Sequence, residues 1–294
     1  MATPTIDASE PAEASPLEPY DREAAVEVAE VKHPGGGPLS KAADALHRPL
    51  DRIVDAAFDT AVGEAVDRVL SEAVERIQDA SSWTVRETQI VEKFRDRGHS
   101  VGALPDAASL TLEQVDDVVG HLNRKYRLLA FAEGTVTGAA GLPGMLVDIP
   151  LVLGIAIRGT TELAAHYGFY PLDAHEKRYV LDLVSVAASP TLEMREASLG
   201  SLDEASAELG SRRSEAETVL AMQVVERLAE SIVARLARGK IAQGIPLVGA
   251  FIGGGFNRWF VGQVMQLAEA VYRERFLVRR YGLEAVRRAQ QVHS

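Results

Sequence analysis

Residues 134–157 read GTVTGAAGLPGMLVDIPLVLGIAI, a stretch in which Asp148 is the only charged side chain. A second apolar stretch, residues 241–257, reads IAQGIPLVGAFIGGGFN and carries no charge. A helix that is apolar on all sides is either central to a large core or in contact with lipid. The two stretches therefore predict two Gly/Pro-rich apolar helical hairpins, which are either buried in the protein or inserted in a bilayer.

Neither stretch has the form of a simple transmembrane helix. A spanning helix needs about 20 apolar residues, whereas Asp148 and two prolines interrupt the first stretch and Pro246 breaks the second. Small residues four apart let helix backbones approach closely, in membranes and in soluble cores alike. That spacing occurs at Gly134, Gly138, Gly249 and Gly253. Both locations, core and lipid, stay open.

The rest of the chain has the periodicity of amphipathic helices. Apolar residues recur at spacings of three and four between Leu50 and Ile77, with charged residues between them. A capping box is a helix start in which two side chains satisfy free backbone N–H groups. The sequence contains three of them: Thr111 with Gln114, Asp173 with Glu176, and Ser214 with Glu217. They predict helices over residues 112–132, 174–188 and 215–238. No alternating strand pattern accompanies them, so the predicted fold class is mainly α, a compact multi-helix domain.

Acidic residues gather at the N-terminus. The formal net charge of the chain is -11, and residues 1–30 hold eight acidic side chains against the single base Arg22. These residues contain few large apolar groups to offset the entropy of ordering. We therefore predict a disordered acidic arm over residues 1–40, dispensable for folding, and a helical domain over residues 41–294.

Composition also excludes several classes of function. An acidic protein repels the phosphate backbone of nucleic acids, so no nucleic-acid partner is expected. The chain has no cysteine, which excludes disulfides, thiolate nucleophiles and cysteine-ligated metals. Its N-terminus lacks the basic start and the apolar region of a secretory signal, so no such signal is predicted there.

Asp148 has two interpretations, because a carboxylate within an apolar run is costly unless it is paired, protonated or solvated. In the first, Asp148 caps a helix whose first turn contains Pro150, a position that suits proline. In the second, it is a polar point in a hairpin that faces a membrane or lines a ligand site. The cap is the favoured interpretation.

Glu162 and His166 share one face of a predicted helix, a spacing that can chelate a metal. Arg158 lies four residues before Glu162, so a surface ion pair explains the carboxylate equally well. The enzymatic alternative is a soluble hydrolase or metal-dependent enzyme that uses Glu133, Asp148, Glu162 and His166 around a helical pocket. The sequence favours a protein that is not an enzyme, with no catalytic residue, metal or cofactor assigned.

Both apolar stretches contain short motifs. The first holds Ala132-Glu133-Gly134-Thr135, Gly141-Leu142-Pro143 and Val147-Asp148-Ile149-Pro150, and Tyr167-Gly168-Phe169 follows it. The second holds Ile245-Pro246-Leu247-Val248-Gly249-Ala250 with Gly253 and Asn257. In this order the motifs resemble the signature of the EcsC family over about residues 85–290. The motif positions are Glu133, Gly134, Gly138, Gly141, Pro143, Asp148, Pro150, Tyr167, Gly168, Pro246, Gly249, Gly253 and Asn257.

The resemblance implies a context and no mechanism. EcsC-like proteins are bacterial, and the founding member is encoded beside an ABC transporter. The resemblance therefore implies a non-catalytic accessory or regulatory protein, linked to an ABC transporter. We expect it to be cytoplasmic and either peripheral to the inner membrane or partly inserted in it. The expected partner is the membrane surface or a membrane protein.

Overall fold

Helices form nearly all of the chain that the computed structural model describes, namely residues 16–33, 83–138, 141–169, 174–189, 195–202 and 249–291. No strand occurs in these ranges. The prediction of a mainly α, multi-helix fold is confirmed. The elements are α1 (Pro19–Lys32), α6 (Glu87–Asp96), the 3-10 helix η1 (Leu104–Ser109), α7 (Leu112–Val119), α8 (Leu122–Gly138), α9 (Gly141–His166), α10 (Ala174–Ala187), α13 (Gly249–Tyr281) and α14 (Leu283–Gln291).

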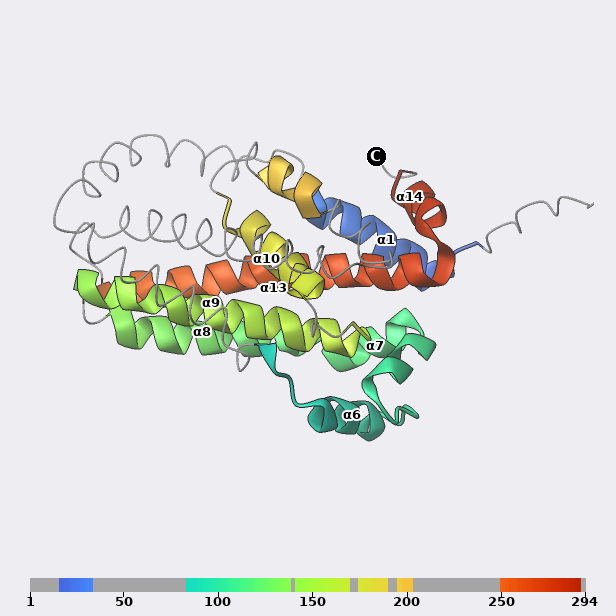
Figure 1. The fold of residues 1–294 in the computed structure, drawn as a ribbon, viewed down its shortest axis with the longest axis horizontal. Coiled ribbons are helices and arrows are strands. Elements are labelled where there is room, and N and C mark those ends of the chain that lie inside the picture. The colour runs from blue at the N-terminus through green and yellow to red at the C-terminus, as the bar shows by residue number, and fades with distance from the viewer. Residues whose placement is uncertain are drawn as a thin grey trace, which may run out of the picture.

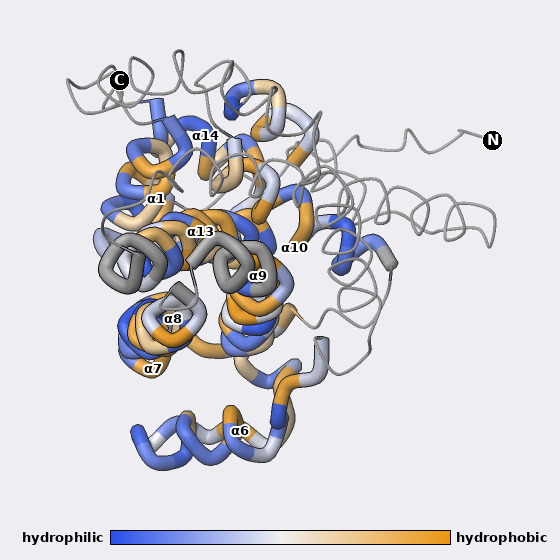
Figure 2. The backbone as a smooth tube through the Cα atoms, turned by 90° about the vertical axis from the view of Figure 1, so that its left-hand side faces the viewer, coloured by the Kyte–Doolittle hydropathy of each residue, from blue (hydrophilic) through white to orange (hydrophobic). Residues whose placement is uncertain are grey.

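The long helix α13 organises the molecule. Figure 1 shows it running through the body, with α8 and α9 along one side and α1 and α14 on the other. Seen end-on, α9 and α13 carry many hydrophobic residues, whereas α6 is mostly hydrophilic (Figure 2). The centre of the core is formed by fully buried side chains of these three helices: Tyr126, Ala130, Ile149, Leu153, Phe260 and Val264.

Glycines let α8 and α13 approach each other closely. A Cβ atom on Gly254 would lie 2.5 Å from the Thr135 hydroxyl oxygen and 2.9 Å from the Phe131 carbonyl oxygen. Further along the pair, a Cβ on Gly262 would lie 3.1 Å from Arg127 Nε. Later residues of α13 thus meet earlier residues of α8, so the two helices run antiparallel.

Gly254→Ala should therefore destabilise the protein, whereas Gly255→Ala should not. The added methyl group at residue 254 meets backbone that cannot move without shifting a helix, and overpacking of this kind costs about 1–3 kcal/mol. Nothing lies within 4 Å of a Cβ on Gly255, where alanine gains up to about 1 kcal/mol of helix propensity. Urea unfolding of both variants measures the difference. Equal stabilities would contradict the close approach.

The first apolar stretch forms the predicted hairpin, made of the end of α8 and the first half of α9. Five of its α9 residues belong to the core, namely Ile149, Val152, Leu153, Ala156 and Ile157, which are at most 1% exposed. For these residues the buried alternative is correct, because α8 and α13 cover them. The second stretch enters α13 at Gly249, and residues 241–248 lie outside the described part of the chain.

The favoured interpretation of Asp148 as a helix cap is wrong. Helix α9 begins at Gly141, so Asp148 and Pro150 both lie inside it. Proline removes only one backbone donor, and the helix continues through it to His166. Asp148 is buried, with its carboxylate facing another helix.

The predicted disordered arm is wrong for Pro19–Lys32, which form α1. Ala24, Ala25 and Val28 are buried in its contacts with α13 and α14. Small apolar residues at helical spacing suffice here because polar contacts support them. Residues 1–15 and 34–40 of the predicted arm lie outside the described residues.

Acidic and basic side chains of α1 are part of this contact. The Tyr281 hydroxyl donates to Asp21 Oδ2 at 2.6 Å, and Lys32 Nζ donates to Glu274 Oε2 at 3.0 Å. Composition alone predicted that the carboxylate of Asp21 is solvated. In the structure it accepts a hydrogen bond from the C-terminal part of the chain.

The capping predictions have mixed outcomes. The Thr111 box is confirmed, since the Gln114 backbone N–H donates to Thr111 Oγ1 at 3.3 Å and the Thr111 N–H donates to Gln114 Oε1 at 3.0 Å. The single helix predicted over residues 112–132 is wrong, because α7 ends before Gly120 and α8 begins at Leu122. The helix predicted over residues 174–188 is confirmed as α10. Residues 50–77 and 215–238, with Asp173 and Ser214, lie outside the described residues.

Candidate functional site

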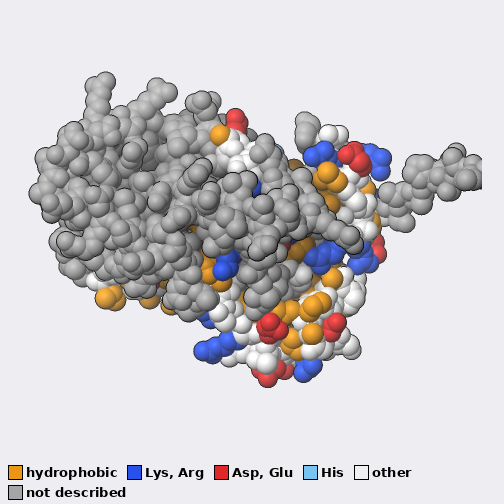
Figure 3. Space-filling model, in the orientation of Figure 1, with side chains coloured by type: hydrophobic (Ala, Val, Ile, Leu, Met, Phe, Trp, Pro, Cys, Tyr) orange, Lys and Arg blue, Asp and Glu red, His pale blue; other side chains and the backbone are white. Residues whose placement is uncertain are grey.

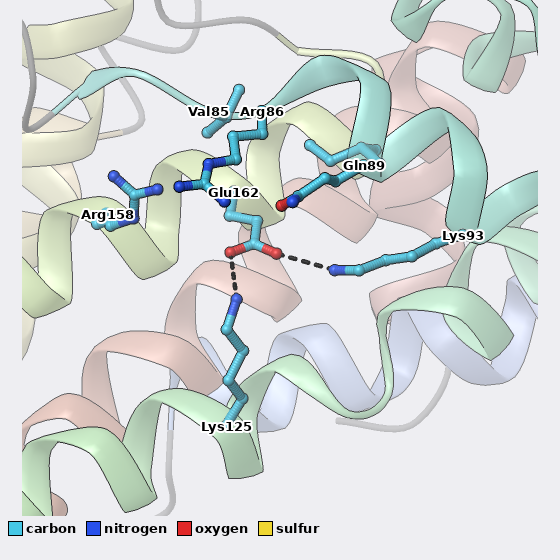
Figure 4. A pocket seen from close by; sticks show the side chains of 8 residues that line it. Val85, Arg86, Gln89, Lys93, Lys125, Arg158 and Glu162 are labelled. Atoms are coloured by element: carbon cyan, nitrogen blue, oxygen red, sulfur yellow. Dashed lines mark hydrogen bonds and ion pairs between the residues drawn. The ribbon is translucent and has the colours of Figure 1, made fainter.

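A pocket of about 310 Å³ opens between the start of α6, α8 and α9. Figure 4 shows its side chains, which come from three separate parts of the sequence. The lining, called the basic pocket below, consists of Val85, Arg86, Gln89, Ile90, Lys93, Lys125, Arg158 and Glu162.

Helical spacing explains how these side chains converge. Arg86 directly precedes α6, and Gln89 and Lys93 follow it at intervals of three and four residues, which places them on one face of the helix. Arg158 and Glu162 are likewise four apart on α9. The pocket therefore receives one face of α6, one face of α9 and the side chain of Lys125 from α8.

Glu162 is the only carboxylate in the pocket lining, and it is held by three donors. Lys93 Nζ lies 2.9 Å from Oε1, while Lys125 Nζ and the Tyr126 hydroxyl lie 2.7 and 2.5 Å from Oε2. Burial alone would raise the pKa of Glu162, but hydrogen bonds from these groups outweigh it and lower the pKa to about 2. Glu162 is therefore ionised at neutral pH.

The surface ion pair predicted between Arg158 and Glu162 is replaced by these lysine contacts. Glu162 is mostly buried, and its pairs reach across to α6 and α8. Within the described residues, neither Arg86 nor Arg158 forms an ion pair. The basic pocket thus holds four cationic side chains and one carboxylate that is already bound to two of them.

His166 lies behind the pocket and is fully buried. Its Nδ1 donates to the Glu162 carbonyl oxygen at 2.7 Å, and its ring lies 5.8 Å from that of Phe94. Burial lowers the pKa of His166 to about 4, with the charge of Lys93 adding to the effect. The imidazole is therefore neutral at pH 7.

The four residues of the enzymatic alternative do not converge. Asp148 precedes Glu162 by fourteen residues of α9, which corresponds to roughly 21 Å along the helix axis. Glu133 lies on the neighbouring helix α8, and its carbonyl oxygen accepts from Thr137. Among the described residues, no group of three or more His, Asp or Glu side chains is placed to hold a metal ion.

Asp148 and Asn257 join the two predicted motif stretches. Asn257 Nδ2 donates to both Asp148 carboxylate oxygens, at 2.8 and 2.7 Å, across 109 residues of sequence. Both side chains are buried. The contact ties α9 to α13 and gives the two motif residues a shared structural role.

Tyr167-Gly168-Phe169 forms the turn that ends α9. The Tyr167 hydroxyl donates to Asp116 Oδ1 at 2.6 Å, so it ties the end of α9 to α7. Gly168 has a φ of +74°, a backbone conformation that favours glycine. The guanidinium groups of Arg275 and Arg279 lie 4.1 and 3.8 Å from the ring centroid of Phe169.

The other motif positions lie along the same helices. Glu133, Gly134 and Gly138 are in α8, Gly141 begins α9, and Pro143 and Pro150 lie within it. Gly249 begins α13, which also contains Gly253 and Asn257, and Pro246 lies outside the described residues. The structure thus distributes these positions over the α8–α9–α13 core and does not gather them in the basic pocket.

Large apolar side chains are exposed on α8 and α13. Leu128, Leu129 and Val136 of α8 are 50%, 48% and 75% exposed, and Trp259 of α13 is 55% exposed. On α13, Trp259 lies between Gly254, which contacts Phe131, and Gly262, which contacts Arg127. Trp259 is therefore at the same height along the helix pair as Leu128 and Leu129. Helical periodicity turns these exposed positions to the same side of the antiparallel pair. This surface is called the α8–α13 face below.

Basic residues border the α8–α13 face. Arg124 and Lys125 precede its leucines on α8, Arg258 precedes Trp259 on α13, and all three are exposed. In Figure 3, hydrophobic side chains are also visible at the end of the molecule where α8 and α9 meet. Among the described helices, none is both long enough and apolar enough to cross a membrane.

Sequence reasoning missed most of both surfaces. Arg86, Lys93 and Lys125 belong to segments without a motif, and only the Arg158–Glu162 spacing pointed to the basic pocket. Leu128 and Leu129 lie before the first apolar stretch, and Trp259 lies after the second. The signal that was available for these three residues is an apolar side chain on the face of a helix where the periodicity predicts polar residues.

Comparison with known proteins points to one family. The sequence model of the EcsC protein family matches residues 24–277, most of the chain. Two relatives come from Bacillus subtilis (strain 168): "Uncharacterized protein YdbA", 22% identical over 40% of this chain and 44% of its own length, and "Protein EcsC", 32% identical over 29% of this chain and 36% of its own length. The alignments therefore span less than half of either relative. No solved structure matches the chain.

Proposed function

This chain belongs to the EcsC family, and on that premise we propose that it is a non-catalytic accessory protein that binds the cytoplasmic surface of the bacterial inner membrane. The observation that carries the proposal is the α8–α13 face, where Leu128, Leu129, Val136 and Trp259 are exposed beside cationic side chains. An ABC transporter is the partner that the family resemblance implies. An accessory protein of such a transporter would act at that membrane surface.

The apolar part of the face supplies binding energy without a spanning helix. Full burial of a leucine side chain contributes about 1.5–3 kcal/mol, and several such side chains on one side of a helix pair can enter the interfacial layer together. Tryptophan is enriched at that depth, because its ring is amphipathic. Trp259 has this position beside the α8 leucines.

The charged part selects an anionic surface. The whole chain is acidic, with a net charge of -11, so an anionic membrane repels most of it. Arg124, Lys125 and Arg258 reverse the sign locally, and a basic residue near an anionic bilayer contributes about 1 kcal/mol. The proposal therefore fixes the orientation, with the α8–α13 face toward the lipid.

The test is flotation of the purified full chain with vesicles of phosphatidylcholine and phosphatidylglycerol. Leu129→Glu and Trp259→Glu should each lower the vesicle-bound fraction at least about tenfold, since each places a charge where an apolar side chain is buried on binding. Leu283→Glu is the matched control, because Leu283 is 45% exposed but lies on α14. It should bind like the parent chain.

Two outcomes contradict the proposed orientation. One is an equal loss of binding in the Leu283 control, which would reflect total charge alone. The other is absence of vesicle binding by the parent chain at low salt, where attraction between charges is strongest.

A further inference from the structure

We infer that the basic pocket is a binding site for the phosphate group of a phosphate monoester. Its lining presents Arg86, Lys93, Lys125 and Arg158 around one space of about 310 Å³. Glu162 is the only negative side chain in this lining. The inference concerns a site separate from the apolar residues of the α8–α13 face and does not depend on membrane binding.

The charges in the pocket are unbalanced. Glu162 accepts from both Lys93 and Lys125, so its charge is shared between two cations. Arg86 and Arg158 add two further positive charges, and Figure 4 shows both guanidinium groups directed into the same space. Like charges that share a pocket repel one another, and an anion between them relieves that repulsion.

The residue types favour phosphate among anions. A guanidinium presents a planar fork of donors that matches phosphate oxygens in a bidentate way, and lysine adds a mobile point charge. Four cations against one carboxylate leave an excess that a dianion neutralises better than a monoanionic carboxylate does. Gln89 adds an uncharged amide, which can donate to a phosphate oxygen.

The pocket has room for part of the molecule that carries the phosphate. Val85 and Ile90 contribute apolar surface to the lining, which suits a short carbon chain attached to the phosphate. Lys125 lies on α8 four residues before Leu129, so the pocket borders the α8–α13 face. The phosphate monoester can therefore be a soluble molecule or the headgroup of a lipid such as phosphatidic acid.

Calorimetric titration of the full chain with glycerol 3-phosphate tests the shared chemistry without any membrane. Arg86→Gln and Arg158→Gln should each weaken binding at least about tenfold, the value of one charge-assisted hydrogen bond. Arg288→Gln is the matched control, because it removes an exposed arginine of α14 that lines neither the pocket nor the α8–α13 face. It should leave the affinity unchanged.

Two further changes should each raise the affinity for glycerol 3-phosphate. Glu162→Gln removes the competing carboxylate, so the affinity for glycerol 3-phosphate should rise. Arg86, which is exposed, remains the safer variant if loss of Glu162 unfolds the chain. Affinity should also increase from pH 5 to pH 7.5, because the second ionisation of a phosphate monoester has a pKa of about 6.

Vesicles then distinguish the two sources. If the ligand is a lipid headgroup, vesicles with phosphatidic acid should bind better than vesicles with the diester phosphatidylglycerol, and Arg86→Gln should abolish that preference. If the ligand is soluble, glycerol 3-phosphate binds and the two vesicles bind alike. Binding of neither probe, or equal weakening by Arg288→Gln, would overturn the inference.

Discussion

Asp116→Ala should destabilise the folded chain by about 3–5 kcal/mol, because it removes a carboxylate that accepts hydrogen bonds from two tyrosines and a mostly buried arginine. Tyr20 and Tyr167 donate to Asp116 at 2.8 and 2.6 Å, and Arg273 Nε and Nη2 donate to Oδ2 at 2.9 and 2.7 Å. Burial opposes the charge of Arg273, but the hydrogen bonds that it donates to Asp116 outweigh this effect and raise the pKa of the arginine. Alanine leaves this cation with Glu27, an exposed partner.

Asp117→Ala is the matched control for this prediction. Asp117 follows Asp116 on α7 but is exposed and pairs with exposed Arg97. Exposed ion pairs contribute about 0–1 kcal/mol, so the two neighbouring substitutions should differ by several-fold in cost. Urea unfolding at neutral pH compares them. A loss of less than 1 kcal/mol for Asp116→Ala would show that the network contributes little to stability.

Deletion of residues 1–33 should have the second large effect, a loss of about 5 kcal/mol or more in the free energy of unfolding. The deletion removes the apolar contacts of Ala24, Ala25 and Val28. It also removes Tyr20, Asp21 and Lys32, which hydrogen-bond to α7, α13 or both. Thermal unfolding of the shortened chain measures the cost.

Two substitutions in the full chain test whether the loss of stability comes from the missing α1 contacts and not from the shorter chain. Ala25→Lys places a charge at a fully buried position of α1 and should reproduce much of the loss. Glu23→Lys changes charge at an exposed position of the same helix and should have little effect. An unchanged melting temperature after the deletion would favour the dispensable arm that composition predicted.

The sequence predicted best what nearest neighbours along the chain determine. The Thr111 capping box needs only side chains three residues apart, and α10 follows from its own periodicity. The break at Gly120 was not predicted, because the apolar pattern continues across it while the helix does not. Composition misjudged α1 because its stability comes from distant parts of the chain.

The same distinction explains the outcome for the sites. Asp148 was interpreted from its neighbour Pro150, but its partner Asn257 lies 109 residues away. Glu162 was interpreted from Arg158 one turn earlier, whereas the side chains that bind it are Lys93, Lys125 and Tyr126. Spacing identifies which residues share a helix face, and tertiary packing decides what that face meets.

The contacts between α1 and α13 can form only after both helices have been synthesised. Arg273 binds Glu27, and Lys32 binds Glu274, across 246 and 242 residues respectively. Because α1 precedes α13 in the sequence, a ribosome that adds about 5–20 residues per second makes α1 first. Its contacts on α13 are then synthesised roughly tens of seconds later. Until that moment α1 lacks its contacts with α13, and a co-translational chaperone would be placed to shield its apolar side chains.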